Sequence, residues 1–390
     1  MKTLAAEQQT ICLNMIVKNE SKVIERCLAS VKPLIDYWVI VDTGSGDNTC
    51  DIIRKTMAQI PGELHERPWQ NFEVNRNEAL DLAKGKGDFL LFIDADEVLV
   101  YDENFQFPKL DRDFYYFNIK NEKSGSITSE YLRVLLINNH LNYRWEGVIH
   151  ECLNVNNAKS YALMTKIFNL SRTNEGARAQ DPQKYLNDAQ VLEKALKADP
   201  DNTRYVYYLA ASYLNAKEWQ LAINNFQKRI FLEPNRAGSG EIFNSLIFIG
   251  ACQVQLSIEN KTVIDSFSKA FLYDQSRAEP LYNLGCYLID QTSFFLADLV
   301  LRKALTIPMP GKLPASSYFI PWIYDWGILH KLAECSFKMG KLQDSQETLE
   351  KLITRPLPAD LLEAMQENLK SIKTIEQQKL QMPSRSFASL

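Results

Sequence analysis

The N-terminal part of the chain alternates short apolar runs with amphipathic stretches, and this alternation constrains the fold more than any other feature. Ile11–Val17, Tyr37–Val41 and Phe89–Ile93 have the length and apolar character of buried strands, and a shorter strand is expected at Leu64–Arg67. Helical patterns lie between these runs, including one over Asn75–Lys84. Repeated strand–helix units favour a mainly parallel sheet with helices on both faces, whose ligands bind beyond the carboxyl ends of the strands.

The composition is that of a globular protein, because 46% of the 390 residues are apolar and 24% are charged. A net charge of −4 argues against nucleic-acid partners, which need a basic face. No run approaches the roughly 18 apolar residues that cross a membrane, so no integral membrane segment is expected. Met1–Thr10 lacks the apolar core of a signal peptide, and seven scattered cysteines have no metal or redox spacing. These features predict a cytoplasmic protein.

A polar segment from Arg172 to Pro182 precedes a repetitive helical pattern. A leucine followed by a small residue recurs three times, at Leu209-Ala210, Leu284-Gly285 and Leu332-Ala333. Twelve residues after the second member of each pair comes another small residue, at Ala222, Ala297 and Ser345. Sixteen residues after it comes a large apolar residue, at Phe226, Leu301 and Leu349. Pro200 and Pro234 are spaced by 34 residues. The pattern resembles irregular tetratricopeptide repeats, with a plain helical bundle as the alternative.

Acidic residues follow two of the expected strands. Asp94 and Asp96 come directly after Phe89–Ile93, and two carboxylates in this spacing suit a hard divalent cation shared with a diphosphate. Asp42 follows Tyr37–Val41, where its carboxylate can accept a hydrogen bond from a nucleobase ring N–H. The alternative for Asp42 is that it only shapes a turn, and for Asp47 we favour that structural role.

Two further segments contain residues that could bind a ligand or take part in catalysis. Arg76 and Asn77 open a helix ahead of the Asp94 strand, and an arginine there can fork onto a phosphate or remain a solvated helix residue. The segment Trp145–Glu151 combines an aromatic ring with Glu146, His150 and Glu151. Histidine can act as a metal ligand or base and glutamate as a base, although a lone histidine in an apolar strand is more often a core residue.

Together these segments resemble the family-2 glycosyltransferases of the GT-A fold. The resemblance extends from Ile11 to about Glu151 and rests on the order and spacing of five stretches: Asn14–Glu20, Val39–Ser45, Arg76–Ala79, Phe92–Glu97 and Val148–Glu151. The tetratricopeptide-like tail narrows it to the branch that includes bacteriocin S-glycosyltransferases and related peptide-modifying enzymes. We therefore predict a GT-A α/β domain over residues 1–176, followed by an all-α tetratricopeptide-like helical-repeat domain over residues 177–390.

The resemblance implies a role for each candidate residue. Asp42 would bind the base of a nucleotide sugar, Arg76 with Asn77 and Asp94 would contact the diphosphate side, and Asp96, Asp94 and His150 would hold Mn²⁺ or Mg²⁺. Asp96 is the expected direct ligand, and histidine favours manganese. Glu151, or alternatively Glu146, would be the catalytic base. Relatives often carry a second histidine where this chain has Asn169.

The predicted function is an inverting, metal-dependent transfer of a sugar, expected as a UDP-hexose, to a peptide or protein acceptor. One alternative is a transferase for an envelope glycan or lipid-linked sugar. Another is a non-catalytic repeat scaffold that keeps the glycosyltransferase fold. The repeats would either hold the acceptor on an extended surface or join two copies into a homodimer.

Overall fold

The computed structural model describes residues 9–381, except residues 124, 173–174, 234–239, 312–318 and 356. The strands are β1 (Ile11–Val17), β2 (Tyr37–Asp42), β3 (Gly62–Glu66), β4 (Phe89–Phe92), β5 (Glu97–Tyr101), β6 (Phe114–Lys123), β7 (Ser126–Asn138), β8 (Arg144–Glu146), β9 (Cys152–Asn154) and β10 (Tyr161–Arg172). The longer helices are α1 (Ile24–Val31), α2 (Thr49–Thr56), α3 (Phe72–Leu82), α4 (Lys184–Ala198), α5 (Thr203–Asn215), α6 (Trp219–Leu232), α7 (Gly240–Gln255), α8 (Asn260–Tyr273), α9 (Glu279–Asp290), α10 (Phe294–Leu305), α11 (Ile328–Lys338), α12 (Leu342–Leu352) and α13 (Ala359–Gln381). Short helical turns are η1 (Lys32–Leu34), η2 (Ala177–Gln180) and η3 (Ile323–Gly327).

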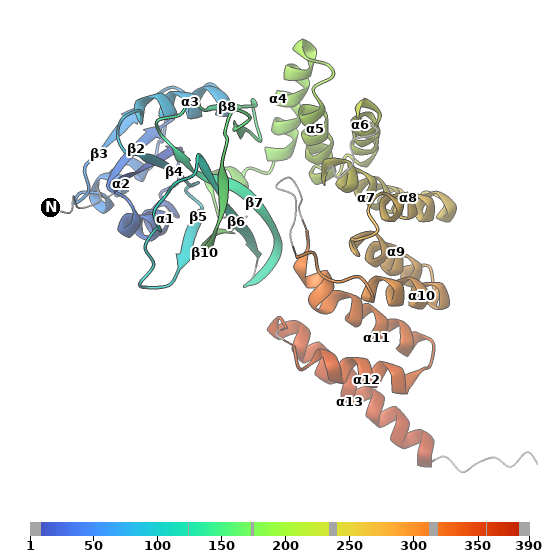
Figure 1. The fold of residues 1–390 in the computed structure, drawn as a ribbon. Helices are drawn as coiled ribbons and strands as arrows, with labels where there is room; N and C mark the ends of the chain where they lie inside the picture. Colours follow the sequence, from blue (N-terminus) through green and yellow to red (C-terminus); the bar gives the residue numbers. More distant parts are fainter. Residues whose placement is uncertain are drawn as a thin grey trace, which may run out of the picture. The chain divides into compact units, whose positions relative to one another are not determined.

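The central sheet has the strand order β3-β2-β1-β4-β7-β6-β10-β5. Strands β3, β2, β1 and β4 are parallel neighbours, as are β6 and β10, whereas β7 and β5 run antiparallel to the strands beside them. The carboxyl ends of β1, β2 and β4 therefore meet at one edge of the sheet. This arrangement confirms the predicted α/β class with a mainly parallel sheet (Figure 1).

The two faces of the parallel strands bury different residues because side chains alternate along a strand. Leu13 and Met15 of β1 belong to the same core as Ile24 of α1 and Ile53 of α2. Cys12 lies on the opposite face, in a second core that contains residues of α3 and β4. The sheet is thus covered on both faces, as the strand–helix pattern predicts.

Helix α3 begins earlier than the sequence pattern suggests. We expected it to start at Asn75, but it starts at Phe72 because the side chain of Asn71 accepts a hydrogen bond from the Val74 N–H and caps the first turn. The extra turn carries Glu73 and brings Arg76 into the body of the helix, where its side chain is buried.

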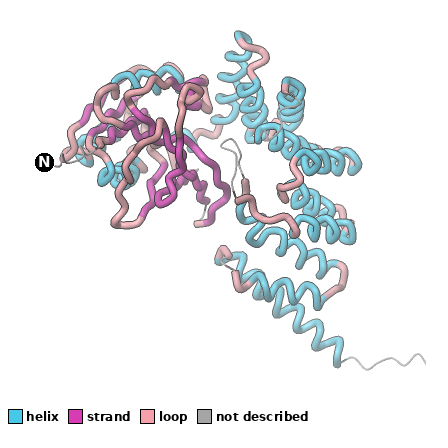
Figure 2. The backbone as a smooth tube through the Cα atoms, in the orientation of Figure 1, coloured by secondary structure: helices cyan, strands magenta, loops and turns pink. Residues whose placement is uncertain are grey.

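From α5 onward the helices form consecutive pairs, which Figure 2 shows as cyan segments joined by short loops. Within a pair the recurring small residues allow close packing: a Cβ atom on Gly285 of α9 would lie 2.5 Å from the side chain of Leu301 in α10. In the pair α11–α12, the Ser345 hydroxyl donates to the Ala333 carbonyl at 2.8 Å. These helix pairs confirm the tetratricopeptide-type repeats. Pro234 of the predicted period lies outside the described residues.

The chain separates into two compact units. The first contains residues 1–242 and 313–319, and the second contains residues 243–312 and 320–390. The strands give way to helices after β10, near the domain boundary that the sequence predicts at residues 176–177, but α4, α5 and α6 belong to the same compact unit as the sheet. Among the described residues, no helix is long and apolar enough to cross a membrane.

Candidate active site

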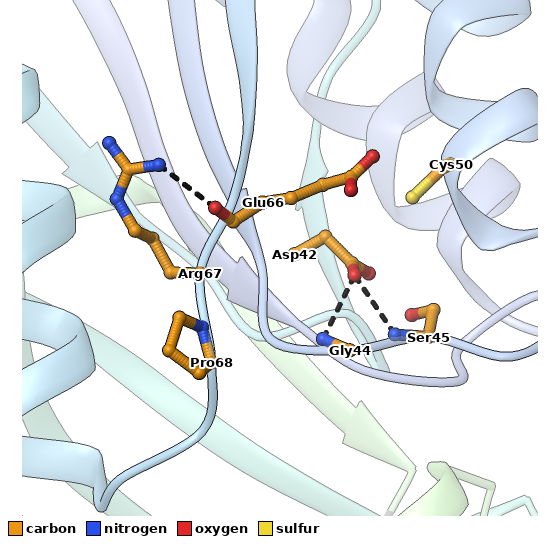
Figure 3. Close-up of a pocket in the computed structure, with 7 residues that line it drawn as sticks. All are labelled: Asp42, Gly44, Ser45, Cys50, Glu66, Arg67 and Pro68. Atoms are coloured by element: carbon orange, nitrogen blue, oxygen red, sulfur yellow. Dashed lines mark hydrogen bonds between the residues drawn. The ribbon is translucent and has the colours of Figure 1, made fainter.

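An open pocket of about 380 Å³ lies at the carboxyl ends of β2 and β3. Figure 3 shows the residues that line it, which are Asp42, Gly44, Ser45, Cys50, Glu66, Arg67 and Pro68. Asp42 is the last residue of β2, and its Oδ1 atom accepts hydrogen bonds from the Gly44 and Ser45 amides at 3.0 and 2.9 Å. Gly44 has a φ of 104°, a backbone conformation that glycine adopts readily. The turn therefore fixes one oxygen of Asp42.

The other carboxylate oxygen of Asp42 lacks a strong hydrogen-bond donor among the described residues. Oδ2 is buried and accepts no hydrogen bond within the described part of the chain. The thiol of Cys50 lies beside this carboxylate, and burial together with the charge of Asp42 raises the pKa of Cys50 to about 11. A buried carboxylate oxygen without a strong donor is costly unless a ligand satisfies it. The geometry agrees with both sequence interpretations, because one oxygen shapes the turn and the other is left for a donor.

A buried ion-pair network lies at the neighbouring strand end. Arg76 donates from Nε to Glu151 Oε1 at 2.5 Å and from Nη2 to Asp94 Oδ1 at 2.6 Å. The guanidinium also lies over the ring of Trp145, with 4.9 Å from Cζ to the ring centroid. The sequence-predicted residues Arg76, Asp94 and Glu151 are thus brought together from α3, the end of β4 and the loop after β8.

Asp94 has a second arginine partner that the sequence analysis missed. Arg133 of β7 donates to Asp94 Oδ2 at 3.1 Å and also pairs with Glu97. Burial opposes the ionisation of Asp94, but Arg76 and Arg133 outweigh it and hold its pKa well below the usual range. Asn169, where the resemblance led us to expect a histidine, donates to Glu97 at 2.7 Å. An arginine in the middle of the mostly apolar stretch Tyr131–Leu136 was the available signal.

Asp96 differs from Asp94 because no other residue in the described part donates a hydrogen bond to its carboxylate. Burial, and then the charges of Asp94 and Glu97, raise its pKa to about 6. Glu20 lies in the same electronegative region, where burial, and then Asp96 and Asp94, raise its pKa to about 7. A crowded, unpaired carboxylate of this kind fits one oxygen ligand of a hard cation whose other ligands come from a diphosphate and water.

His150 lies in a loop of unusual backbone conformation, with a φ of 52°. Its ring stacks on Tyr208 at a centroid distance of 4.2 Å. His150 keeps an exposed face. Loss of hydration against α5, and then the charges of Arg178, Arg204 and Lys184, lower its pKa. The described residues contain no group of three or more His, Cys, Asp and Glu side chains that could hold a metal ion. The predicted ligands Asp94, Asp96 and His150 thus do not form a closed protein cage here.

The remaining predicted site residues have structural contacts. Asn77 donates to the Trp145 carbonyl and accepts from the Trp145 amide, both at 2.9 Å, which fixes β8 on α3. Glu146 is exposed and accepts from Asn154 at 2.6 Å. Asp47 accepts from the Thr49 amide at 3.0 Å at the start of α2, in keeping with the structural role we favoured.

Comparison with known proteins defines the class. Residues 12–105, which include Asp42, Arg76, Asp94 and Asp96, match the family model described as glycosyl transferase family 2. The match assigns residues 12–105 to a glycosyltransferase domain of this type, in agreement with the predicted class of enzyme and fold.

Particular relatives are each similar to a portion of the chain. It is 25% identical over 237 residues to the SPbeta prophage-derived glycosyltransferase SunS of Bacillus subtilis (strain 168), a match that covers 58% of this chain and 54% of SunS. The chain thus spans about half the length of this relative. It is 38% identical over 99 residues to the TPR repeat-containing protein Synpcc7942_0270 of Synechococcus elongatus, covering 25% of this chain and 23% of that protein. A solved thermophilic TPR protein of Thermus thermophilus aligns with 49% of this chain and 91% of its own, at 17% identity and a TM-score of 0.35.

Proposed function

We propose that this protein transfers a sugar, with inversion, from a nucleotide sugar to a peptide or protein acceptor, and that the donor is a UDP-hexose. The observation that carries the proposal is the Asp42 carboxylate, which lines the pocket at the end of β2 and whose buried Oδ2 atom has no nitrogen or oxygen donor among the described residues. The imide N–H of uracil is a donor of the required kind. The pocket is open and polar, as a site for a nucleoside needs to be.

The diphosphate would lie beyond the ends of the parallel strands, the usual position of ligands on such sheets. Arg76 has one nitrogen, Nη1, with no hydrogen-bond partner in the described residues, while its other contacts fix the plane of the guanidinium. An arginine held in this way can donate to a phosphate oxygen without reorganising. In this proposal Asp94 acts mainly by orienting Arg76 and Arg133.

Glu151 is the better candidate than Glu146 for the catalytic base. The Glu151 side chain is 10% exposed and belongs to the network with Arg76 and Asp94, whereas Glu146 is exposed and bound to Asn154. As the acceptor attacks C1 of the sugar from the face opposite the diphosphate, Glu151 would take the acceptor proton while the bond from C1 to the diphosphate oxygen breaks.

Asp96 is the residue we propose as the protein ligand of Mn²⁺ or Mg²⁺. A bound cation would neutralise the negative charge that develops on the departing diphosphate. Magnesium in particular is commonly held by one or two carboxylates together with substrate phosphates, so a three-residue protein cage is not required. His150 remains a proposed further ligand.

The acceptor proposal rests on the helix pairs from α5 onward. Stacked pairs of this type offer an extended surface, which suits an elongated peptide better than a small sugar. The same surface can instead join two copies of the chain, and an envelope glycan or lipid-linked sugar remains the alternative acceptor.

The donor proposal is tested by calorimetric titration of the full-length protein with UDP, GDP and CDP in the presence of Mn²⁺. Binding of UDP with the greatest affinity, followed by release of UDP from a UDP-hexose, is the expected result. Binding of UDP without any turnover of UDP-sugars would favour the scaffold alternative. Absence of nucleotide binding would contradict the proposal.

The acceptor is tested by mass spectrometry after incubating the protein and its UDP-sugar with a peptide library or with lipid-linked sugars. A mass increase of one hexose on a peptide supports the proposal, and modification of only the lipid-linked sugar overturns it. Light scattering on the same preparation determines whether the protein is a homodimer.

A further inference from the structure

Helix α5 contacts the loop that carries His150 and Glu151, although more than fifty residues separate them in sequence. Both segments belong to the first compact unit of the chain. Arg204 donates from Nη2 and Nε to the His150 carbonyl at 2.6 and 3.2 Å. One helical turn further along α5, the ring of Tyr208 stacks on the His150 ring with an interplanar angle of 10°. The helix therefore contacts both the backbone and the side chain of His150.

The loop needs such support because its backbone is held in sparsely populated conformations. His150 has a φ of 52°, in the left-handed region that non-glycine residues rarely adopt, and Gly147 has a φ of 114°, which favours glycine. Conformations of this kind persist only where surrounding contacts determine them. Glu73 of α3 accepts from the Gly147 amide at 3.0 Å, and the hydroxyl of Tyr205 accepts from the Val148 amide at 3.3 Å.

We propose that Arg204 and Tyr208 are positioning residues for the active site, so that the first helix of the repeat array holds the His150–Glu151 loop in its working conformation. The contact with His150 is transmitted along the backbone to Glu151, which directly follows it and pairs with Arg76. Arg204 itself lies over the Tyr208 ring, with 4.9 Å between its Cζ and the ring centroid, so the two residues act as one clamp. Helix α5 is in this way part of the site as well as part of the helix pairs.

If Arg204 and Tyr208 position the loop, replacing them should reduce turnover much more than it reduces substrate binding. Loss of a positioning contact displaces the reacting groups, and a misplacement of about 1 Å can reduce the rate on the order of a hundredfold. Arg204→Ala and Tyr208→Ala should therefore lower kcat for UDP-hexose turnover by about ten- to a hundredfold, with little change in KM. Tyr208→Phe keeps the stacked ring and should restore most of the wild-type rate.

Tyr213→Ala is the matched control. Tyr213 lies on the same helix, but its hydroxyl donates to Glu193 of α4 rather than to the loop. Tyr213→Ala should lower the temperature of unfolding without changing kcat in the folded protein. If it reduces kcat as much as Tyr208→Ala does, α5 acts only through general stability and the positioning role is wrong.

The kinetic test rests on the proposed function, so a second measurement is independent of activity. Hydrogen exchange of full-length protein, followed by mass spectrometry, reports on the amides of residues 147–152. Arg204→Ala and Tyr208→Ala should raise exchange in this segment severalfold, and Tyr208→Phe and Tyr213→Ala should not. Unchanged exchange in the alanine variants would overturn the clamp even if the protein is a glycosyltransferase. Raised exchange without any sugar turnover in the wild type would instead contradict the proposed function alone.

Discussion

The Nε atom of Arg76 lies 2.5 Å from Oε1 of Glu151, and this contact joins the helix before β4 to the loop after β8. Because the same guanidinium reaches Asp94, one side chain links the proposed base to the acidic turn. The Arg76 side chain is therefore expected to contribute both to the stability of the fold and to the arrangement of the charged groups at the strand ends.

Replacing Arg76 by glutamine should destabilise the fold. The change leaves the buried carboxylate of Glu151 without its cationic partner and leaves Asp94 paired with Arg133 alone, and such a loss costs about 1–3 kcal/mol. Urea denaturation of the variant measures it. Arg144→Gln is the control, because Arg144 forms an exposed pair with Asp81, and its loss should cost no more than about 1 kcal/mol. Equal effects of the two substitutions would contradict the structural importance of the Arg76 network.

Replacing Asp42 by asparagine should weaken binding of UDP. The variant can keep the Oδ1 contacts to Gly44 and Ser45, but it places an amide NH₂ where the free carboxylate oxygen stands. The lost charge-assisted hydrogen bond is worth about 1.5–3 kcal/mol, or roughly ten- to a hundredfold in Kd. Calorimetry with UDP measures the change. Asp47→Ala removes contacts to Thr49 at the start of α2 and to the Ser21 amide, but Asp47 does not line the pocket. It should leave UDP affinity unchanged, and an equal loss in that control would assign both effects to loop folding.

The metal proposal makes a prediction for Asp96. Asp96→Asn should abolish the dependence of UDP binding on Mn²⁺, because the variant removes the unpaired carboxylate while keeping its volume. The free energy of unfolding should not fall, since the substitution removes a negative charge beside Asp94 and Glu97. Titration of Mn²⁺ into the UDP-bound protein provides the test. A variant that binds Mn²⁺ with wild-type affinity would exclude Asp96 as a ligand.

The close packing of Gly285 against Leu301 should contribute to the stability of the helix pairs. Gly285→Val should destabilise the second compact unit by about 1–3 kcal/mol, because the added side chain collides with the fully buried Leu301. Thermal unfolding of the full chain measures this. Combining the substitution with Leu301→Ala should cost less than the sum of the single changes, since the smaller residue makes room. Strict additivity would show that the two residues do not pack together.

The features that could be predicted from the sequence are those with a local signature. Asp42 and Asp94 follow apolar strands directly, and the spacing from Gly285 to Leu301 is set by one helix, one turn and the next helix. Parallel strands align their carboxyl ends, so the position of Asp42 and Asp94 at one edge followed from the pattern.

The features that could not be predicted depend on pairing between distant segments. Arg133 reaches Asp94 because β7 inserts antiparallel beside β4, and no local pattern sets that neighbour. The contact of Arg204 with His150 depends on how α5 packs on the loop. The two residues lie on opposite sides of the domain boundary that the sequence predicts. The role of His150 as a metal ligand was implied by the resemblance alone and stays a prediction, whereas its stacking on Tyr208 could not be expected from any local pattern.

The most direct test of the account is the release of UDP from a UDP-hexose by the full-length protein, with Glu151→Gln and Glu146→Gln compared under identical conditions with Mn²⁺. The account predicts turnover by the wild type. It also predicts a loss of about 10²–10⁴-fold in Glu151→Gln at nearly unchanged UDP affinity, and nearly full activity in Glu146→Gln. Loss of activity only in Glu146→Gln would contradict the assignment of the base. A wild-type protein that releases UDP from no UDP-hexose would contradict the proposed transfer from a UDP-hexose.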